Sequence, residues 1–318
     1  MMNKDELDKI NMKDNKKVKA LVLTGFGLNC DIETAHAFEF AGAEAQRVHI
    51  NSLISGKVAL DDFHILAFGG GFSWGDDHGA GVIQALKLKN HIGDKILEFV
   101  NQGKLVIGIC NGFQTLVNLG LLPGIERDYK TRSVALTWND SGNFRDQWVS
   151  LAVNQNSPCV FTKEFSSQTI KANSSDREKT LNYFELPIRH AQGKFVADDS
   201  VIDRLIANNQ VVLRYANIKG ENSEIEPAMQ RFPLNPNGSI YDIAGICDST
   251  GHIFGLMPHP EAYNHYTNHP NWTKTIEDLK RSPKELKDSN RYSTITDNEI
   301  TPGMKIFTNG VRYMSSKL

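Results

Sequence analysis

The sequence predicts an α/β fold, in which a doubly wound, mostly parallel sheet is flanked by helices and carries a smaller antiparallel β excursion. From residue 18 onward, short runs of β-branched and aliphatic residues alternate with longer amphipathic stretches, which is typical of βαβ units. The strand-like runs are continuously apolar, as expected of strands buried on both faces of a sheet. These two observations together predict an open sheet with helices on both sides.

The first 120 residues supply the parallel part of this sheet. Strands are predicted, in chain order, at "VKALVLTG", "AQRVHI", "FHILAFGGG" and "KLVIGIC". Helices are predicted between them at "DIETAHAFEFAGA" and "GVIQALKLKNHIGDKILEFVNQG". In the first of these helices Ala37, Phe38 and Ala41 recur at helical spacing, and Gly42 is a suitable terminator.

The second half of the chain has a different pattern. Apolar and polar residues alternate in "SVALTWNDSGNFRDQWVSLAV", which predicts antiparallel strands. Further strands are predicted at "PIRHAQGKFVA", "NQVVLRYA" and "SIYDIAGICDSTGHIFGLMPHPE", the last with a hairpin turned at 248–251. The run "PGMKIFTNGVRYM" predicts a short closing helix.

The organisation expected is a charged N-terminal arm at 1–17 followed by a single domain at 18–318. Two polar stretches, near 158–181 and 266–300, are expected to be insertions in that domain. Neither an internal repeat nor a linker-like segment divides the chain.

Composition and charge exclude several classes of protein. The 35 basic and 37 acidic residues give a net charge of −2, so no general attraction to nucleic acid or to a membrane surface is expected. The four cysteines are far apart and form no C-x-x-C pair, which favours reduced thiols over zinc or a redox dithiol. The N-terminus lacks the apolar core of a signal peptide, and no apolar run has the length of about 20 residues that a membrane span needs. We therefore expect a cytoplasmic protein.

Cys110 is the strongest candidate for a chemical group. It stands between the strand-like "KLVIGI" and the helix-like "NGFQTLVNLG", and ligands of open α/β sheets bind at the carboxyl ends of strands. Gly108 and Gly112 flank it, as a sharp strand-to-helix turn that exposes a nucleophile requires. The start of a helix also favours thiolate over thiol. The alternative is that Cys110 is a buried structural thiol with no catalytic role.

A thiolate that attacks a carbonyl needs hydrogen-bond donors for the oxyanion that forms. Three glycines end the strand "FHILAFGGG" and leave backbone N–H groups unshielded. Either Gly71 or Phe72, together with the N–H of Asn111, is predicted to form this oxyanion hole. A triple glycine by itself is more often a tight turn or a phosphate-binding loop.

A base is also required, and "GLMPHPE" narrows the choice among ten histidines. His259 follows an apolar strand and lies between two prolines, with Glu261 two residues later. Side chains at i and i+2 of an extended segment point the same way, so Glu261 is expected to orient His259 in a Cys-His-Glu arrangement. His190, in "PIRHAQG", is the competing candidate.

Five segments together resemble class I glutamine amidotransferases. They are "GLNCDIETAHAFEFAGA", "GGFSWGDD", "GICNGFQTL", "NPNGS" and "GLMPHPE", and they lie within residues 18–265. More narrowly, the same segments resemble the glutaminase component of phosphoribosylformylglycinamidine synthase. It implies the flavodoxin-like sheet of that family and a reaction in which Cys110 attacks the amide of glutamine.

The resemblance also implies the later steps and the partners. His259, held by Glu261, protonates the departing ammonia, and water then hydrolyses a glutamyl thioester. Gln114 is expected to contact the amino-acid end of glutamine, and Asn237, Gly238 and Ser239 to line the same pocket. Ammonia passes to a synthetase partner that converts formylglycinamide ribonucleotide to formylglycinamidine ribonucleotide. No cofactor or metal is expected in this chain, and ATP and Mg²⁺ are expected on the synthetase.

Two positions and one longer run depart from the family pattern, and other functions stay open. Gly69 replaces the usual proline, Trp74 replaces the usual tyrosine, and "PIRHAQG" stands where a His-Gly-Glu-Gly run is common. Cys30 belongs to a family Asn-Cys-Asp run and is expected to be structural or to lie at the pocket edge. The alternative functions are another class I amidotransferase or a related cysteine hydrolase. A non-enzymatic scaffold is disfavoured because the nucleophile, the base and its carboxylate are all present.

Overall fold

The computed structural model describes residues 17–163, 165, 168–170, 179–181, 183–219, 224–281 and 300–318. Nearly all of the predicted N-terminal arm, and parts of the stretches at 158–181 and 266–300, lie outside the described residues.

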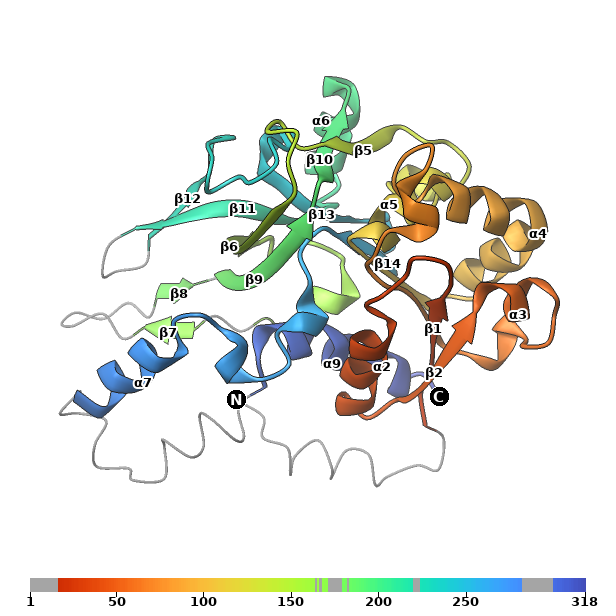
Figure 1. The fold of residues 1–318 in the computed structure, drawn as a ribbon, viewed down its shortest axis with the longest axis horizontal. Coiled ribbons are helices and arrows are strands. Elements are labelled where there is room, and N and C mark those ends of the chain that lie inside the picture. Colours follow the sequence, from red (N-terminus) through yellow and green to blue (C-terminus); the bar gives the residue numbers. More distant parts are fainter. Residues whose placement is uncertain are drawn as a thin grey trace.

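One large mixed sheet organises the molecule (Figure 1). Five neighbouring strands are parallel, in the order β2 (Glu44–His49), β1 (Lys19–Thr24), β3 (Ile65–Phe68), β4 (Leu105–Ile109) and β14 (Ile253–Leu256). The sheet continues in antiparallel pairing through β13 (Ile243–Cys247), β11 (Val211–Lys219), β6 (Arg145–Val153) and β9 (Tyr183–His190), and β12 (Glu224–Pro227) pairs with β11. Within the described residues, two smaller sheets pair β5 (Val134–Trp138) with β10 (Gln192–Ala197) and β7 (Gln168–Ile170) with β8 (Lys179–Leu181).

Helices cover both faces of the parallel part (Figure 1). The α-helices are α2 (Asp31–Phe40), α3 (Ile50–Ile54), α4 (Val82–Asn101), α5 (Asn111–Leu119), α6 (Asp199–Ala207), α7 (Trp272–Arg281) and α9 (Pro302–Ser315). α2 packs against α9, and α4 packs against α5. This two-sided cover explains why the parallel strands are apolar throughout.

The predicted fold class is confirmed. The helix after Cys110, the hairpin between β13 and β14 and the closing helix α9 all form. The run at 133–153 forms two strands that pair with different partners: β5 with β10, and β6 with β9 and β11. Alternation of apolar and polar residues predicts that a segment is a strand. Which strand it pairs with depends on residues far away in the chain.

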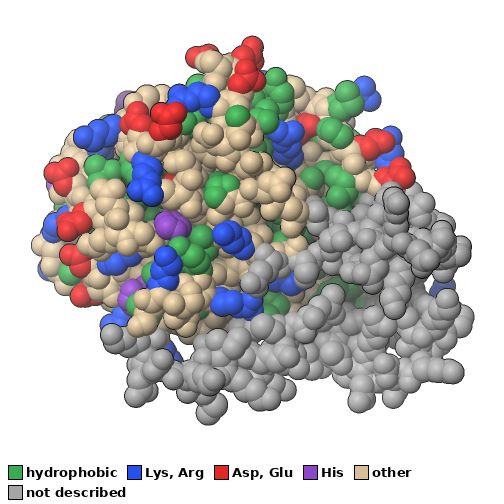
Figure 2. All heavy atoms as spheres, turned by 180° about the vertical axis from the view of Figure 1, so that it is seen from behind, with side chains coloured by type: hydrophobic (Ala, Val, Ile, Leu, Met, Phe, Trp, Pro, Cys, Tyr) green, Lys and Arg blue, Asp and Glu red, His purple; other side chains and the backbone are tan. Residues whose placement is uncertain are grey.

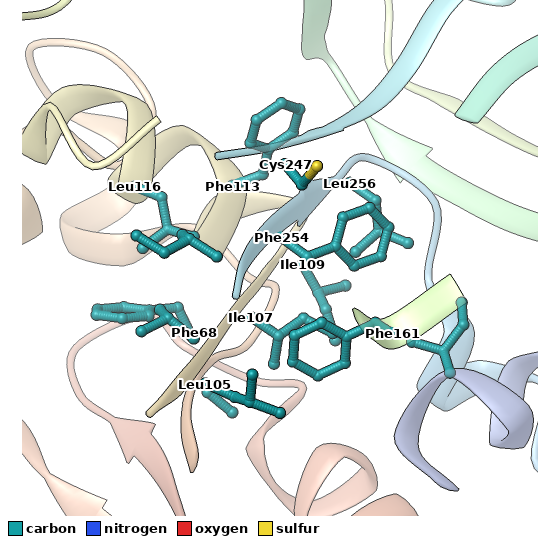
Figure 3. Close-up of a cluster of buried hydrophobic side chains, with 14 of the residues drawn as sticks. Phe68, Leu105, Ile107, Ile109, Phe113, Leu116, Phe161, Cys247, Phe254 and Leu256 are labelled. Atoms are coloured by element: carbon teal, nitrogen blue, oxygen red, sulfur yellow. The ribbon is translucent and has the colours of Figure 1, made fainter. Parts of the chain in front are cut away.

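The core lies on both sides of β4 (Figure 3). Ile107 and Ile109 of this strand are fully buried. Phe113 of α5 and Phe161, Phe254 and Leu256 belong to the same cluster of buried side chains. Burial of each such side chain stabilises the fold by about 1.5–3 kcal/mol. The strand that ends at Cys110 is therefore held rigidly in the middle of the molecule.

The surface charge and the character of the helices agree with the expectations drawn from composition. On the face seen in Figure 2, basic and acidic side chains are interspersed over the described area. Within the described ranges, no helix has both the length and the apolar character that a membrane crossing demands.

Candidate active site

Cys110 lies on a strained turn between β4 and α5. Its backbone has φ +52° and ψ −108°, a conformation that costs energy in any residue other than glycine. Close packing explains the two neighbouring glycines. A Cβ on Gly112 would lie 2.0 Å from the Phe68 carbonyl oxygen, and one on Gly108 would lie 2.7 Å from the backbone of Gly112. The sharp turn predicted for the nucleophile therefore forms.

His259 and Glu261 form a buried pair close to Cys110. Nδ1 of His259 lies 2.6 Å from Oε1 of Glu261, and the two residues are 2% and 1% exposed. Burial by itself lowers the pKa of His259, but Glu261 and then Cys110 raise it, and the pKa lies well above its usual value. The backbone N–H of His259 donates to the Pro187 carbonyl at 2.8 Å, which fixes the segment.

The end of β3 supplies donors for an oxyanion. The N–H of Phe72 donates to the Gly27 carbonyl at 2.8 Å. Among the residues that the structure describes, the N–H groups of Gly71 and Asn111 have no acceptor. Of the two predicted alternatives beside Asn111, the geometry therefore favours Gly71 over Phe72. Gly71 has φ +139°, in the region that favours glycine.

The segment 189–193 lies across the nucleophile. The thiol of Cys110 is 3.6 Å from the Arg189 carbonyl oxygen. Nε2 of Gln114 donates to the Gln192 carbonyl at 2.5 Å, and its Oε1 accepts from Nδ2 of Asn111 at 3.2 Å. Both ends of the Gln114 side chain are thus engaged within the protein. This arrangement suits a residue that positions the segment 189–193, whereas the predicted contact with glutamine stays a prediction.

His190, the competing base, is buried and held by Asn139. Its Nδ1 lies 3.1 Å from Oδ1 of Asn139. Burial, and then the charge of His259, lower the pKa of His190 to about 3. An imidazole with so low a pKa is neutral and weakly basic near pH 7. The geometry and the charge therefore favour His259 as the base.

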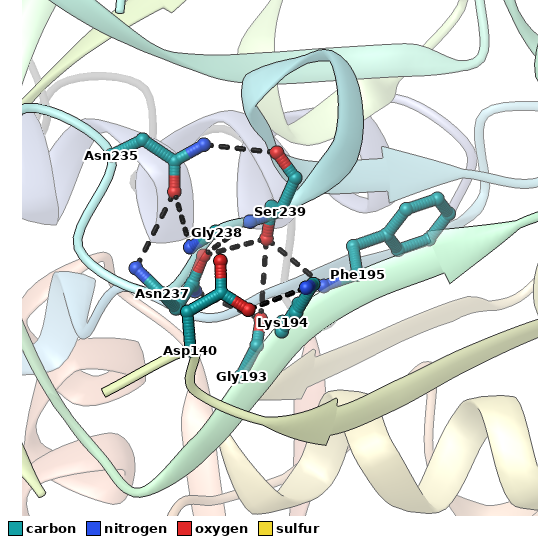
Figure 4. Close-up of polar contacts among 8 residues, drawn as sticks. All are labelled: Asp140, Gly193, Lys194, Phe195, Asn235, Asn237, Gly238 and Ser239. Atoms are coloured by element: carbon teal, nitrogen blue, oxygen red, sulfur yellow. Dashed lines mark hydrogen bonds and ion pairs between the residues drawn. The ribbon is translucent and has the colours of Figure 1, made fainter. Parts of the chain in front are cut away.

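The "NPNGS" run is buried and binds the protein's own backbone (Figure 4). Asn237 donates from Nδ2 to the Gly193 carbonyl at 2.9 Å and to the Tyr215 hydroxyl at 3.2 Å. The Ser239 hydroxyl accepts from the N–H of Phe195 at 2.9 Å. Gly238 packs so tightly on Asp140 that a Cβ would lie 1.9 Å from its carboxylate. These residues, predicted to line the pocket, thus clamp the strand that follows His190, and their contact with substrate stays a prediction.

Asp76, which was not predicted, and Cys30, which was expected to be structural or at the pocket edge, also lie at the site. Burial raises the pKa of Asp76 to about 6, and this carboxylate accepts a hydrogen bond from Nδ2 of Asn111 at 3.0 Å. Cys30 lies against His259: a Cβ on Gly70 would be 3.2 Å from the Cys30 thiol and 2.7 Å from Cε1 of His259. Cys30 is thus at the pocket edge. Both residues belong to motifs quoted above, "GGFSWGDD" and "GLNCDIE", and that was the available signal.

Known proteins are similar to this chain in sequence and in fold. The CobB/CobQ-like glutamine amidotransferase domain matches residues 17–314. The phosphoribosylformylglycinamidine synthase subunit PurQ of Methanococcus maripaludis is 42% identical over 297 residues, which cover 93% of this chain and 97% of that protein. The subunit of the same name from Dehalococcoides mccartyi is 41% identical over 297 residues, covering 93% of this chain and 98% of that protein.

A solved structure agrees with these relatives. The structure of PurLQS from Thermotoga maritima includes a chain that superimposes with a TM-score of 0.59 at 28% identity, covering 94% of this chain and 100% of that one. The chain therefore belongs to the CobB/CobQ-like glutamine amidotransferase family, alongside the PurQ subunits of phosphoribosylformylglycinamidine synthase.

Proposed function

We propose that this chain hydrolyses glutamine to glutamate and ammonia, and that it delivers the ammonia to a phosphoribosylformylglycinamidine synthetase partner in purine biosynthesis. The observation that carries the proposal is the strained Cys110 turn beside the buried His259–Glu261 pair in a chain 42% identical to PurQ subunits. The similar chain in the structure of PurLQS from Thermotoga maritima supports a synthetase partner.

The reaction begins at the Cys110 thiolate. The sulfur attacks the side-chain amide carbon of glutamine, and the carbonyl oxygen becomes an oxyanion. In this proposal the free N–H groups of Gly71 and Asn111 stabilise it, and a single donor of this kind contributes about 10²–10³ in kcat. The imidazolium of His259 then gives its proton to the leaving nitrogen, so that ammonia departs and a glutamyl thioester forms.

Hydrolysis reverses the roles of the same groups. Neutral His259 takes a proton from water, the resulting hydroxide attacks the thioester carbon, and glutamate leaves as the Cys110 thiolate is regenerated. Glu261 holds the imidazole through Nδ1 in both steps. The proposal needs no cofactor or metal in this chain, and it assigns ATP and Mg²⁺ to the synthetase. A cytoplasmic location is proposed as well, supported by four cysteines that are all free thiols.

The test combines the chain with its cognate synthetase and supplies formylglycinamide ribonucleotide, ATP, Mg²⁺ and glutamine. We expect formylglycinamidine ribonucleotide to form, and Cys110→Ala to abolish the glutamine-supported reaction while ammonium chloride still supports it. If Cys110→Ala retained the glutamine-supported rate, the assignment of the nucleophile would be wrong. If the wild-type chain supported only another acceptor enzyme, the function would shift to another class I amidotransferase.

A further inference from the structure

We propose that Cys30, His259 and Glu261 form a binding site for a soft divalent cation such as Zn²⁺ or Cd²⁺, and that occupation of this site inhibits the enzyme. The inhibition, though not the binding, rests on the proposed role of His259 in glutamine hydrolysis.

The three side chains come together from two loops. Cys30 lies between β1 and α2, and His259 and Glu261 follow β14. One ligand atom from each residue lies within 4.8 Å of the other two, and no other group of three or more such side chains is this close within the described ranges. Donors bound to one zinc ion at 2.0–2.3 Å lie roughly 3–4 Å from each other. A small movement of these side chains therefore brings three of the four ligands of zinc into place.

Gly70 leaves room for the ion. A Cβ at this position would lie 3.2 Å from the Cys30 thiol and 3.4 Å from Nδ1 of His259. Because glycine has no side chain, the space beside the Cys30 thiol and the imidazole ring stays open. Every larger residue at position 70 would fill it.

The donor set suits a soft cation. Thiolate, imidazole and carboxylate are the groups that bind Zn²⁺, whereas Mg²⁺ prefers oxygen ligands in an octahedral arrangement. Oε2 of Glu261 and Nε2 of His259 are buried and have no hydrogen-bond partner among the described residues. Cys30 is only partly buried while the other two are fully buried, so the thiol lies on the solvent side and gives the ion a route of entry.

Binding and catalysis compete for the imidazole. The Cys30 thiol loses its proton to solvent when it binds the ion, as metal-bound thiols do. The His259 imidazolium also releases a proton to solvent, and a ring nitrogen of His259 and a carboxylate oxygen of Glu261 then give lone pairs to the metal. The imidazole is no longer available to carry a proton between Cys110 and the leaving ammonia. The site is thus an inhibitory one, and chelation of the ion should restore activity.

The first experiment measures binding without catalysis. The full chain is titrated with CdCl₂ while the ultraviolet charge-transfer absorption of the Cd–thiolate bond is recorded. We expect one ion per chain in the wild type and in Cys110→Ala, and loss of the band in Cys30→Ser. Cys159→Ala is the matched control, because Cys159 is fully buried and belongs to a separate pair with Cys247. It should keep the band.

The second experiment measures inhibition in the complex with the cognate synthetase. ZnCl₂ should inhibit glutamine-supported synthesis, EDTA should reverse the effect, and excess Mg²⁺ should not reproduce it. Inhibition of each protein is measured against its own uninhibited rate. The ZnCl₂ concentration that halves this rate should be at least about tenfold higher in Cys30→Ser than in the wild type, since an alcohol is not a ligand that zinc selects.

The outcomes separate the two proposals. If Cys30→Ser, shown by circular dichroism to be folded, kept wild-type cadmium affinity, the ion would be bound elsewhere and the site would be rejected. Loss of the band in Cys110→Ala instead would assign the ion to the nucleophile. Absence of glutamine-supported synthesis with the cadmium band intact would reject the proposed function and leave the metal site standing.

Discussion

Glu261 controls the charge of His259. Burial lowers the pKa of this imidazole, and the charge of Glu261 is the largest of the contributions that raise it. We predict that Glu261→Gln lowers kcat/KM by about 10²–10⁴. We also expect the alkaline fall in activity to move at least about one pH unit towards acid, because the imidazolium loses its stabilising partner. Profiles of kcat/KM against pH test this. An unchanged alkaline limb would contradict the role given to Glu261.

Asp76 lowers the stability of the folded protein at the candidate active site. Its folded-state pKa of about 6 is above the ordinary value of 3.8, so the native state holds a proton that the unfolded chain has already released. Stability from this group therefore falls as pH rises from about 4 to 6, and it stays lower above that range. Allowing for solvent around this half-buried carboxylate, the penalty is about 1 kcal/mol.

We predict that Asp76→Asn raises the free energy of unfolding by about 1 kcal/mol at pH 8, with little effect near pH 4. Asparagine suits the site because it can still bond Asn111 and tolerates the φ of +56°. Urea denaturation at both pH values gives the comparison. Asp77→Asn, at an exposed neighbouring position, is the control and should change stability by less than about 0.5 kcal/mol at either pH.

At the scale of elements, the turn between β4 and α5 depends on close backbone packing. A Cβ on Gly112 would meet the Phe68 carbonyl at 2.0 Å, whereas a Cβ on Gly69 has no neighbour nearer than 3.6 Å. We predict that Gly112→Ala lowers the free energy of unfolding by about 3 kcal/mol or more and that Gly69→Ala changes it by less than about 1 kcal/mol. Thermal unfolding followed by circular dichroism distinguishes them, and equal melting temperatures would refute this account.

The sequence predicts the helices, strands and turns better than it predicts which distant residues contact one another. Gly108, Cys110 and Gly112 predict the sharp turn because the requirement for glycine is local. The roles of Asn237 and Ser239 were not accessible in this way, since their partners Gly193 and Phe195 lie more than 40 residues away in the chain. The contact of Cys30 with His259 was equally inaccessible, because His259 is in another loop.

At the scale of the whole molecule, the C-terminal helix α9 supports the segment that contains His259 and Glu261. A Cβ on Gly303 would lie 2.2 Å from the Pro260 carbonyl oxygen, and the Thr301 hydroxyl donates to the Tyr263 carbonyl. Phe307 of α9 packs edge-on against Phe38 of α2, with ring centroids 5.0 Å apart. The last residues of the domain thus hold the segment that contains His259 and Glu261.

We predict that Phe307→Ala lowers the free energy of unfolding by about 3–5 kcal/mol, because it leaves a cavity between α9 and α2. Glutaminase activity should be lost at a lower temperature than in the wild type, as the support for the segment that contains His259 and Glu261 weakens. Ser315→Ala, at an exposed position on the last turn of α9, is the matched control and should change stability by less than about 0.5 kcal/mol. Equal unfolding free energies for the two variants would contradict the stabilising role given to Phe307.

The sequence by itself determined the α/β class, the turn at Cys110 and the His259–Glu261 pair, because each depends on residues close together in the chain. Periodicity, glycine spacing and an i, i+2 relation are local properties. Only the tertiary structure decided that Gly71 rather than Phe72 has a free N–H, that His190 is buried and neutral, and that Cys30 lies against His259. Hydrogen-bond partners and burial depend on which distant segments meet, and chain order does not specify them.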